Sequence, residues 1–273
     1  MSQGILLFAH NNERINDGAF AVWFAKRIHK HLGQSVSLVC DSATLDSIKN
    51  LDTSVFDHII PSEVEAHQHK RYQGELHTFK NLDRVSAWDL TPYDETIILD
   101  TDVAVQSPIL NTLWNSAHDI IVCADAEHVF KRSYEEFNWL SLYSIRFFWA
   151  TQFYFRKTEQ SRLFFETCKW VKQNYAWNSL LYDFDPRLVR NDYLWSIALH
   201  VLGGSAGSTW CATMPWSLLY TTDADTLFNL SDTDILIGSI EPTEICTVKN
   251  RDMHLMNKNQ LEKFVYQELG ITQ

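Results

Sequence analysis

Residues 96–105 read Thr-Ile-Ile-Leu-Asp-Thr-Asp-Val-Ala-Val, an apolar run that two carboxylates interrupt before it resumes. β-Branched and leucine side chains are typical of a buried strand, and two aspartates at its end need a cation or hydrogen-bond donors beside them. The pair Asp100 and Asp102 therefore predicts a strand that ends in a divalent-cation site. The alternative is a pair of solvated aspartates at a strand-to-turn junction.

The D-x-D spacing is not specific by itself, because it occurs three more times, at 183/185, 223/225 and 232/234. Only the first copy directly follows a strand-like run, so only its carboxylates are expected at the carboxyl edge of a sheet, where open α/β sheets bind ligands. The chain contains neither G-x-x-x-x-G-K-[ST] nor G-x-G-x-x-G. A metal ion and cationic side chains, rather than a glycine-rich loop, are therefore expected to hold the phosphates of any bound nucleotide.

The composition is that of a globular protein with ample material for a core: 273 residues, 45% hydrophobic and 13% aromatic. A formal net charge of −11 argues against binding to nucleic acid or anionic lipid by bulk electrostatics. The five cysteines are spread singly without a C-x-x-C, which favours reduced thiols in a cytoplasmic protein. The amino terminus does not read as a signal peptide, and glycine and proline break up the uncharged segment 194–222, so no transmembrane segment is expected.

Hydrophobic runs alternate with helical patterns along the chain, which predicts parallel strands with helices on both faces of a sheet. Asn16 and Gly33 are expected to cap the two ends of the first helix, and Asn191 the start of a later one. The expected strands are 4–9, 36–40, 58–60, 96–99, 120–124, 153–155 and 235–237; the expected helices are 17–32, 42–50, 78–90, 108–114, 159–175, 192–202 and 255–269. Residues 129–143 are expected to form a mobile loop or a helix near the site, and residues 221–231 a loop. The polar segment 63–73, with His67, His69 and the following His77, is interpreted as a solvated loop or helix face rather than a metal site.

Two further stretches give the chain a resemblance to a known family. Residues 86–93, Ser-Ala-Trp-Asp-Leu-Thr-Pro-Tyr, followed by Leu-Asp-Thr-Asp at 99–102, resemble the core of the retaining GT-A glycosyltransferases of the glycogenin, galactinol synthase and lipopolysaccharide galactosyltransferase family. Residues 7–19 resemble that family's first nucleotide-contacting segment. The resemblance covers most of residues 4–260 and is specific only over about 84–114.

The resemblance implies a GT-A (Rossmann-like) α/β fold with a mostly parallel central sheet and flanking helices. A single domain would span residues 1–273, with a donor-binding part at about 1–125 and an acceptor and closing part at about 126–273. The implied activity is metal-dependent transfer of a sugar, with retention, from a nucleotide diphosphate donor, most often a UDP-sugar, with Mn²⁺ or Mg²⁺ as cofactor. The acceptor, whether a saccharide, a lipid-linked glycan or another hydroxyl compound, is not identified.

The resemblance also assigns the metal and diphosphate ligands. Asp100 and Asp102 match the two carboxylate ligands, His254 the third ligand, and Lys258 the cation that touches the diphosphate. His254 and Lys258 stand four residues apart without the glycine that the family usually has between them. Two carboxylates and an imidazole form a mixed oxygen and nitrogen set that suits Mn²⁺.

Further residues take roles toward the donor only through the resemblance. Asp192 matches an acidic residue near the reacting sugar carbon, with partnership to a helix dipole as the structural alternative. Gln152 replaces part of the family's Asn-x-Gly stretch and is expected to hydrogen-bond a sugar hydroxyl, or else to be a buried structural residue. The expected nucleotide and donor contacts are Ala9, Asn11, Asn12, Arg84, Asp100, Thr101 and Asp125. The alternative for Arg84 is that it is an ordinary charged residue on the surface of a helix. Ile15 stands where the family often stacks an aromatic ring on the base, which leaves the preference for uracil open.

Two other functions remain open at this stage. One is a glycosyltransferase that acts on modified nucleic-acid bases, against which the negative charge argues. The other is a nucleotide-sugar-binding protein without turnover, or a metal-dependent phosphohydrolase that uses the same carboxylates. Hydrolases with two metals usually need more ligands in fixed motifs, and the sequence shows none.

Overall fold

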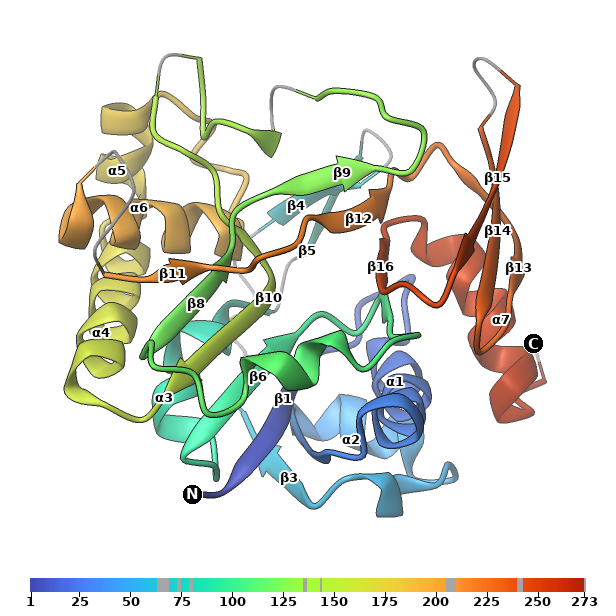
Figure 1. Ribbon diagram of the computed structural model, residues 1–273. Helices are drawn as coiled ribbons and strands as arrows, with labels where there is room; N and C mark the ends of the chain where they lie inside the picture. The colour runs from blue at the N-terminus through green and yellow to red at the C-terminus, as the bar shows by residue number, and fades with distance from the viewer. Residues whose placement is uncertain are drawn as a thin grey trace.

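A computed structural model describes residues 1–62, 69–72, 75–78, 81–134, 137–142, 144–204, 210–239 and 243–272. Its centre is a seven-stranded sheet in the order β11-β8-β10-β6-β1-β2-β3 (Figure 1). The strands are β1 (Gln3–Ala9), β2 (Ser35–Cys40), β3 (His58–Pro61), β6 (Glu95–Leu99), β8 (Ile120–Cys123), β10 (Trp149–Arg156) and β11 (Ala212–Thr213). All neighbours pair in parallel except β10, which runs antiparallel to both β6 and β8. The predicted α/β class with a mostly parallel sheet is confirmed.

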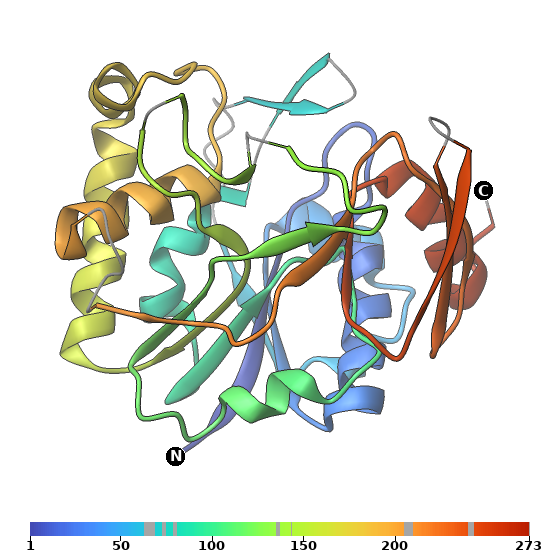
Figure 2. The ribbon, with the colours of Figure 1, turned by 45° about the horizontal axis from the view of Figure 1, so that its top comes forward.

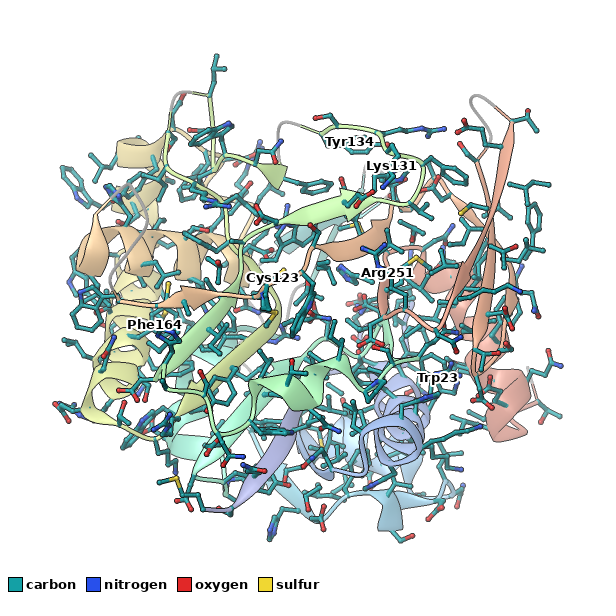
Figure 3. The ribbon with its side chains drawn as sticks, in the orientation of Figure 1. Trp23, Cys123, Lys131, Tyr134, Phe164 and Arg251 are labelled. Atoms are coloured by element: carbon teal, nitrogen blue, oxygen red, sulfur yellow. The ribbon has the colours of Figure 1, made fainter. Side chains whose placement is uncertain are left out.

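Helices cover both faces of this sheet, because alternate residues of each strand point to opposite sides. Ile5 and Leu7 of β1 belong to the core on the α1 side, whereas Leu6 and Phe8 belong to the core under α4 and α6. Figure 3 marks the two layers by Trp23 on α1 and Phe164 on α4. The helices are α1 (Asp17–Leu32), α2 (Ser42–Ile48), α3 (Ala87–Leu90), α4 (Glu159–Gln173), α5 (Tyr175–Tyr182), α6 (Asn191–Gly203) and α7 (Lys258–Leu269), with 3-10 turns η1 (Thr53–Val55), η2 (Asn81–Ser86) and η3 (Ile109–Leu113).

A four-stranded sheet carries the carboxy-terminal part of the chain back to the end of β6. Its order is β7-β16-β12-β9, made of β7 (Val103–Ala104), β9 (Ala126–His128), β12 (Leu218–Thr221) and β16 (Met253–Leu255). The antiparallel pairing of β16 with β7 sets His254 opposite Val103, directly after the D-x-D turn. Figure 2 shows the red strand β16 beside this turn, between the central sheet and α7. A third sheet consists of β13 (Thr226–Leu230), β14 (Asp234–Ser239) and β15 (Glu244–Lys249). The strands β4 (His69–Tyr72) and β5 (Glu75–Thr78) pair with each other in a two-stranded sheet.

The first helix forms as its sequence predicts. The Asn16 side chain accepts a hydrogen bond from the Ala19 amide, and Gly33 ends the helix in the left-handed conformation with φ 64°. Asn191, however, is the first helical residue of α6 and not its cap, a position that Arg190 occupies without a side-chain hydrogen bond. Across the described residues, none of the helices combines the length and the apolar composition that crossing a bilayer requires.

Four other expected elements are wrong, in each case because tertiary contacts override the local pattern. The helix expected over 78–90 is the end of β5 followed by η2 and the short α3, an arrangement that points Arg84 into the core. The segment 221–231 contains β13, whose pairing with β14 is not visible in a local window. The last helix begins at Lys258 and not at residue 255, because residues 253–255 are β16. Of the histidine-rich segment, residues 63–68 and 73–74 lie outside the described residues, and 69–72 form a strand instead of a loop or helix face.

Candidate functional site

The two carboxylates of the D-x-D leave β6 in a tight turn. The Asp100 amide donates to the Thr151 carbonyl of β10 at 3.0 Å, and the Val103 amide donates to the Asp100 carbonyl at 3.3 Å. This turn carries Asp102 from the sheet edge toward β7 and buries it to 5% exposure. The solvated alternative is therefore wrong for Asp102.

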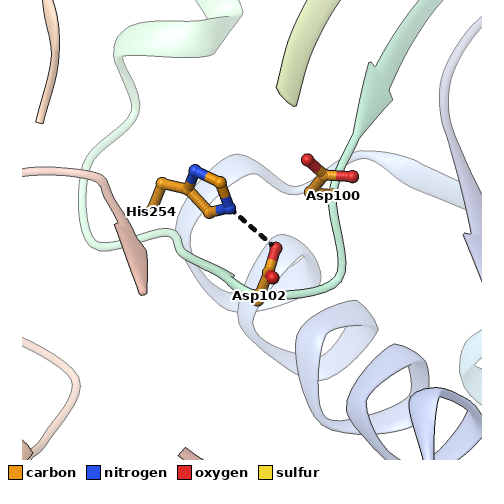
Figure 4. Close-up of side chains that lie close together, drawn as sticks. All are labelled: Asp100, Asp102 and His254. Atoms are coloured by element: carbon orange, nitrogen blue, oxygen red, sulfur yellow. Dashed lines mark ion pairs between the residues drawn. The ribbon is translucent and has the colours of Figure 1, made fainter. Parts of the chain in front are cut away.

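His254 reaches Asp102 from the other end of the chain. The Leu255 amide donates to the Asp102 carbonyl at 2.9 Å, which fixes β16 against the D-x-D turn. The His254 Nε2 atom then lies 3.2 Å from Asp102 Oδ1 (Figure 4). One ligand atom each of Asp100, Asp102 and His254 lies within 4.8 Å of the other two. The three predicted metal ligands thus converge despite the unusual spacing between His254 and Lys258.

This donor set fits a divalent cation. Carboxylate oxygens and an imidazole nitrogen are ligands of Mn²⁺, whereas Mg²⁺ prefers oxygen alone. The His254 Nδ1 atom is buried and makes no hydrogen bond within the described residues. Two carboxylates of like charge within one cluster also repel each other unless a cation lies between them.

Lys258, the first residue of α7, brings a positive charge to the same cluster. Its Nζ lies 2.9 Å from Asp17 Oδ1 and 3.4 Å from Asp102 Oδ2. Burial disfavours the charged amine, but the attraction of Asp102 and Asp17 outweighs it and holds the pKa of Lys258 above its ordinary value. Lys258 is therefore a permanent cation at neutral pH.

Arg84 is almost wholly buried, at 2% exposure, so it is not a surface helix charge. Its guanidinium donates through Nη2 to Asp100 Oδ1 and through Nη1 to the Ala150 carbonyl at 3.2 Å. A planar guanidinium can contact two different groups at once in a fixed geometry, which a single ammonium cannot do. Arg84 therefore orients Asp100 from behind and ties it to the start of β10.

Asp192 has both carboxylate oxygens engaged. Oδ1 accepts from the Ala150 amide at 2.7 Å, and Oδ2 accepts from Arg190 Nε at 3.1 Å. Asp192 therefore anchors the same strand that Arg84 contacts on the carbonyl of Ala150. Gln152, two residues after Ala150 on β10, is 1% exposed, and its Oε1 has no hydrogen-bond partner within the described residues.

The loop after Ala9, the last residue of β1, uses its asparagine side chains to shape itself. Asn11 Oδ1 accepts from the Gly18 amide at 2.9 Å, and its Nδ2 donates to Ser47 Oγ at 2.8 Å. Asn12 Oδ1 accepts from the amides of residues 14 and 15 at 2.9 and 3.0 Å. Asn11 and Asn12 therefore act first as turn-forming residues of the predicted nucleotide-contacting segment.

Asp125 and Thr101 differ in their surroundings. Asp125 lies beyond the end of β8 with a side chain that is 62% exposed, and it pairs with Arg146 at 2.7 Å. Thr101 lies inside the D-x-D turn at 3% exposure. Thr101 thus lies in the turn that carries Asp100 and Asp102, whereas Asp125 forms an ion pair with Arg146 at the surface.

Sequence reasoning missed two neighbours of the cluster. Asp17 looks like an ordinary acidic residue in the first turn of a helix, and nothing local shows that it meets Lys258. Trp149 lies edge-on to His254, with ring centroids 6.2 Å apart, and packs on Tyr220 at 5.2 Å. Two aromatic side chains in contact therefore support the imidazole. This contact depends on the pairing of strands that are distant in the sequence, so no local pattern predicts it.

A buried polar cluster fixes the entry of α7, and its removal is expected to destabilise the protein. Asp225 Oδ2 contacts His128 Nε2 at 2.8 Å and accepts from the Thr222 amide at 2.7 Å. Asn257, the N-cap of α7, donates to the Asp225 carbonyl at 2.9 Å. Asp225→Ala strands the buried His128 donor and is expected to lower the free energy of unfolding by about 3 kcal/mol. Urea unfolding measures this, and an unchanged midpoint contradicts it.

Comparisons with known proteins give structural likenesses only. No family model matches the chain, and no curated protein matches it in sequence. A structure of the galactosyltransferase LgtC with donor and acceptor sugar analogs aligns with a TM-score of 0.47 and 14% identity over 77% of this chain and 72% of that one. The glycosyltransferase GlyE of Streptococcus pneumoniae TIGR4 aligns with a TM-score of 0.42 and 9% identity over 79% of this chain and 46% of that one.

A third structure is that of a putative glucose-1-phosphate thymidylyltransferase from Bacillus anthracis in complex with a sucrose. It aligns with a TM-score of 0.46 and 7% identity over 79% of this chain and 87% of that one. With TM-scores below 0.5, these likenesses leave the function of the chain to be argued from its own residues.

Proposed function

We propose that the protein is a metal-dependent GT-A glycosyltransferase that moves a sugar from a nucleoside diphosphate donor, a UDP-sugar, to a hydroxyl acceptor with retention. The observation that carries this proposal is the convergence of Asp100, Asp102 and His254 within 4.8 Å, at the end of β6 and beside the charged Lys258. The sequence resemblance supplies the reaction class, and the geometry supplies the ligands that this class requires.

Each member of the cluster has a distinct role in this reaction. A bound Mn²⁺ would offset the negative charge that grows on the departing diphosphate. Asp100, Asp102 and His254 would hold the cation, and Arg84 fixes the orientation of Asp100. Lys258 lies at the rim of the same cluster, where its charge meets the phosphate oxygens.

The proposal also assigns the two parts of the single domain. Residues of about 1–125 provide the sheet edge and the D-x-D, and residues of about 126–273 provide the acceptor side. His254 and Lys258 come from the second part, so the donor site is complete only when β16 has paired with β7. Asp125, Asn11, Asn12, Ala9 and Thr101 are the proposed donor contacts around this centre.

A panel of nucleotide sugars with Mn²⁺ tests the function. The expected result is release of the nucleoside diphosphate that stops when EDTA removes the metal. Release that continues unchanged in EDTA contradicts the proposal. The second candidate, a nucleotide-sugar-binding protein without turnover, is favoured if a nucleotide sugar raises the melting temperature but no acceptor or water leads to release.

Gln152 provides a sharp test of the sugar side of the site. Its buried Oε1 lacks a partner within the described residues. If Gln152 only fills space in the core, Gln152→Leu leaves the stability unchanged or improves it and leaves the activity unchanged. A role in binding a donor hydroxyl predicts the same stability with a loss of about 100-fold in kcat/KM. We expect the second outcome. Melting temperature and steady-state kinetics measured together decide it, and full activity of Gln152→Leu contradicts it.

A further inference from the structure

Lys258 occupies a position that by itself disfavours a positive charge. It is the first residue of α7, where the helix dipole repels cations, and its side chain is only 20% exposed. Two carboxylates compensate, Asp17 at 2.9 Å and Asp102 at 3.4 Å. The ammonium of Lys258 is therefore stabilised in this place by two acidic partners.

One of these partners is also a proposed metal ligand. Asp102 contacts His254 through Oδ1 at 3.2 Å and Lys258 through Oδ2 at 3.4 Å. A divalent cation held by Asp102 would repel the ammonium and weaken its contact with Asp102. The contact of Lys258 with Asp17, already the shorter of the two at 2.9 Å, would then be its main anionic partner.

We propose that Asp17 is a positioning residue that holds Lys258 when a divalent cation occupies Asp102. Asp17 would keep the ammonium beside the cluster without competing for the Asp102 carboxylate, where its charge would be available to the diphosphate. This inference rests on the proposed function of the cluster and adds Asp17 to it. No local sequence pattern connects Asp17 with the metal residues.

The surroundings of Asp17 suit this role, because they hold its carboxylate still. Asp17 is 8% exposed and lies in the first turn of α1, where the helix dipole stabilises a negative charge. The next residue, Gly18, donates to Asn11 Oδ1, and a Cβ there would meet the Ile48 side chain at 2.8 Å. Close packing of α1 on α2 thus fixes the backbone that carries Asp17.

The pair between Asp17 and Lys258 is not needed merely to dock α7 on α1. The two helices have a separate contact, in which Trp23 Nε1 donates to Glu268 Oε2 at 2.7 Å. Leu261 of α7 also belongs to the core that contains the buried face of α1. A buried ion pair contributes little net stability compared with such packing, which favours a functional reason for Asp17.

Titration of the protein with Mn²⁺ alone, followed by the EPR signal of the free ion, tests the inference without turnover. Asp17→Asn is expected to weaken Mn²⁺ binding about tenfold, because Lys258 then has only Asp102 as its partner and competes with the ion. The double variant Asp17→Asn/Lys258→Met is expected to bind within about threefold of the wild type, since the competing ammonium is gone. Rescue by removal of a second side chain is a result that general damage to the fold does not produce.

Two further variants serve as controls. Asp17→Glu keeps the charge and is expected to bind Mn²⁺ nearly as the wild type does. Asp232→Asn removes the partner of Lys30 near the other end of α1 and is expected to leave Mn²⁺ binding unchanged. If Asp17→Asn does not fold, Asp17→Ser takes its place in the same comparison.

The outcomes separate this inference from the proposed function. A wild-type protein that binds no Mn²⁺ contradicts the metal site and the inference together. If the wild-type protein binds Mn²⁺ and Asp17→Asn binds it with the same affinity, only the inference is overturned. Weakened binding in Asp17→Asn that Lys258→Met does not restore also overturns it, because Asp17 then acts as a ligand or through the fold.

Discussion

Asp102→Asn is expected to reduce metal-dependent release of nucleoside diphosphate by about 10³-fold, more than any other single substitution in the protein. Asp102 is the residue on which the cluster converges, since His254, Lys258 and the Leu255 amide of β16 all contact it. The amide keeps the size of the side chain but removes the charge that attracts a cation. Initial rates over a range of Mn²⁺ concentrations measure the effect.

The other D-x-D copies provide the matched control. Asp183 is exposed and ends α5 in the left-handed conformation with φ 56°, which asparagine also tolerates. Asp183→Asn therefore makes the same chemical change at the same motif without strain, and its activity is expected to equal that of the wild type. Equal activity of Asp102→Asn and Asp183→Asn would contradict the metal site.

Arg84→Met is expected to weaken Mn²⁺ binding more than any other substitution outside the three proposed ligands. It removes the guanidinium that donates to Asp100 and to the Ala150 carbonyl. Arg84 is only 2% exposed, so little water is available to replace these hydrogen bonds. Loss of a side chain that orients a metal ligand typically weakens metal affinity 10- to 100-fold, so we expect a fall of about 50-fold in apparent Mn²⁺ affinity.

Arg84→Lys distinguishes orientation from charge. Lysine keeps the positive charge but cannot make the two-pronged contact, so its Mn²⁺ affinity is expected to lie between those of the wild type and Arg84→Met. Mn²⁺ titrations of the three proteins, with melting temperatures to confirm folding, make the comparison. Wild-type affinity in Arg84→Met shows that Asp100 does not need this support.

The sequence predicts the centre of the fold well, because local patterns encode it. The run at residues 96–99, the first helix with its caps, and the order of strands and helices follow from hydrophobic periodicity and capping chemistry. The strands β9, β12, β13 and β16 are short, and they are stable only through partners far along the chain. A local window therefore reads them as loops or as the start of a helix.

The same distinction holds for the candidate site. Asp100 and Asp102 stand out from the residues alone, because carboxylates directly follow a buried strand. His254 and Lys258 are identified only through the family resemblance, and their approach to Asp102 depends on the pairing of β16 with β7. Asp17 and Trp149 carry no local signal, because their neighbours in the site lie more than a hundred residues away.

The exposure of Asp125 and the engagement of Asp192 sharpen the proposed chemistry. Asp192 gives one oxygen to the Ala150 amide and the other to Arg190, so its first effect is on the position of the strand that carries Gln152. Asp125 forms a surface pair with Arg146 instead. Gln152, whose Oε1 is buried and has no hydrogen-bond partner within the described residues, is the residue that we propose for contact with a donor hydroxyl.

The proposed function requires that Asp100, Asp102 and His254 bind a divalent cation that also contacts the diphosphate of the donor. Pulsed EPR of Mn²⁺ bound to the protein with a nucleoside diphosphate tests this requirement. We expect nitrogen coupling from the His254 imidazole together with phosphorus coupling from the diphosphate, and we expect His254→Phe to remove the nitrogen coupling alone. A Mn²⁺ spectrum without nitrogen coupling, or with nitrogen coupling that persists in His254→Phe, contradicts it.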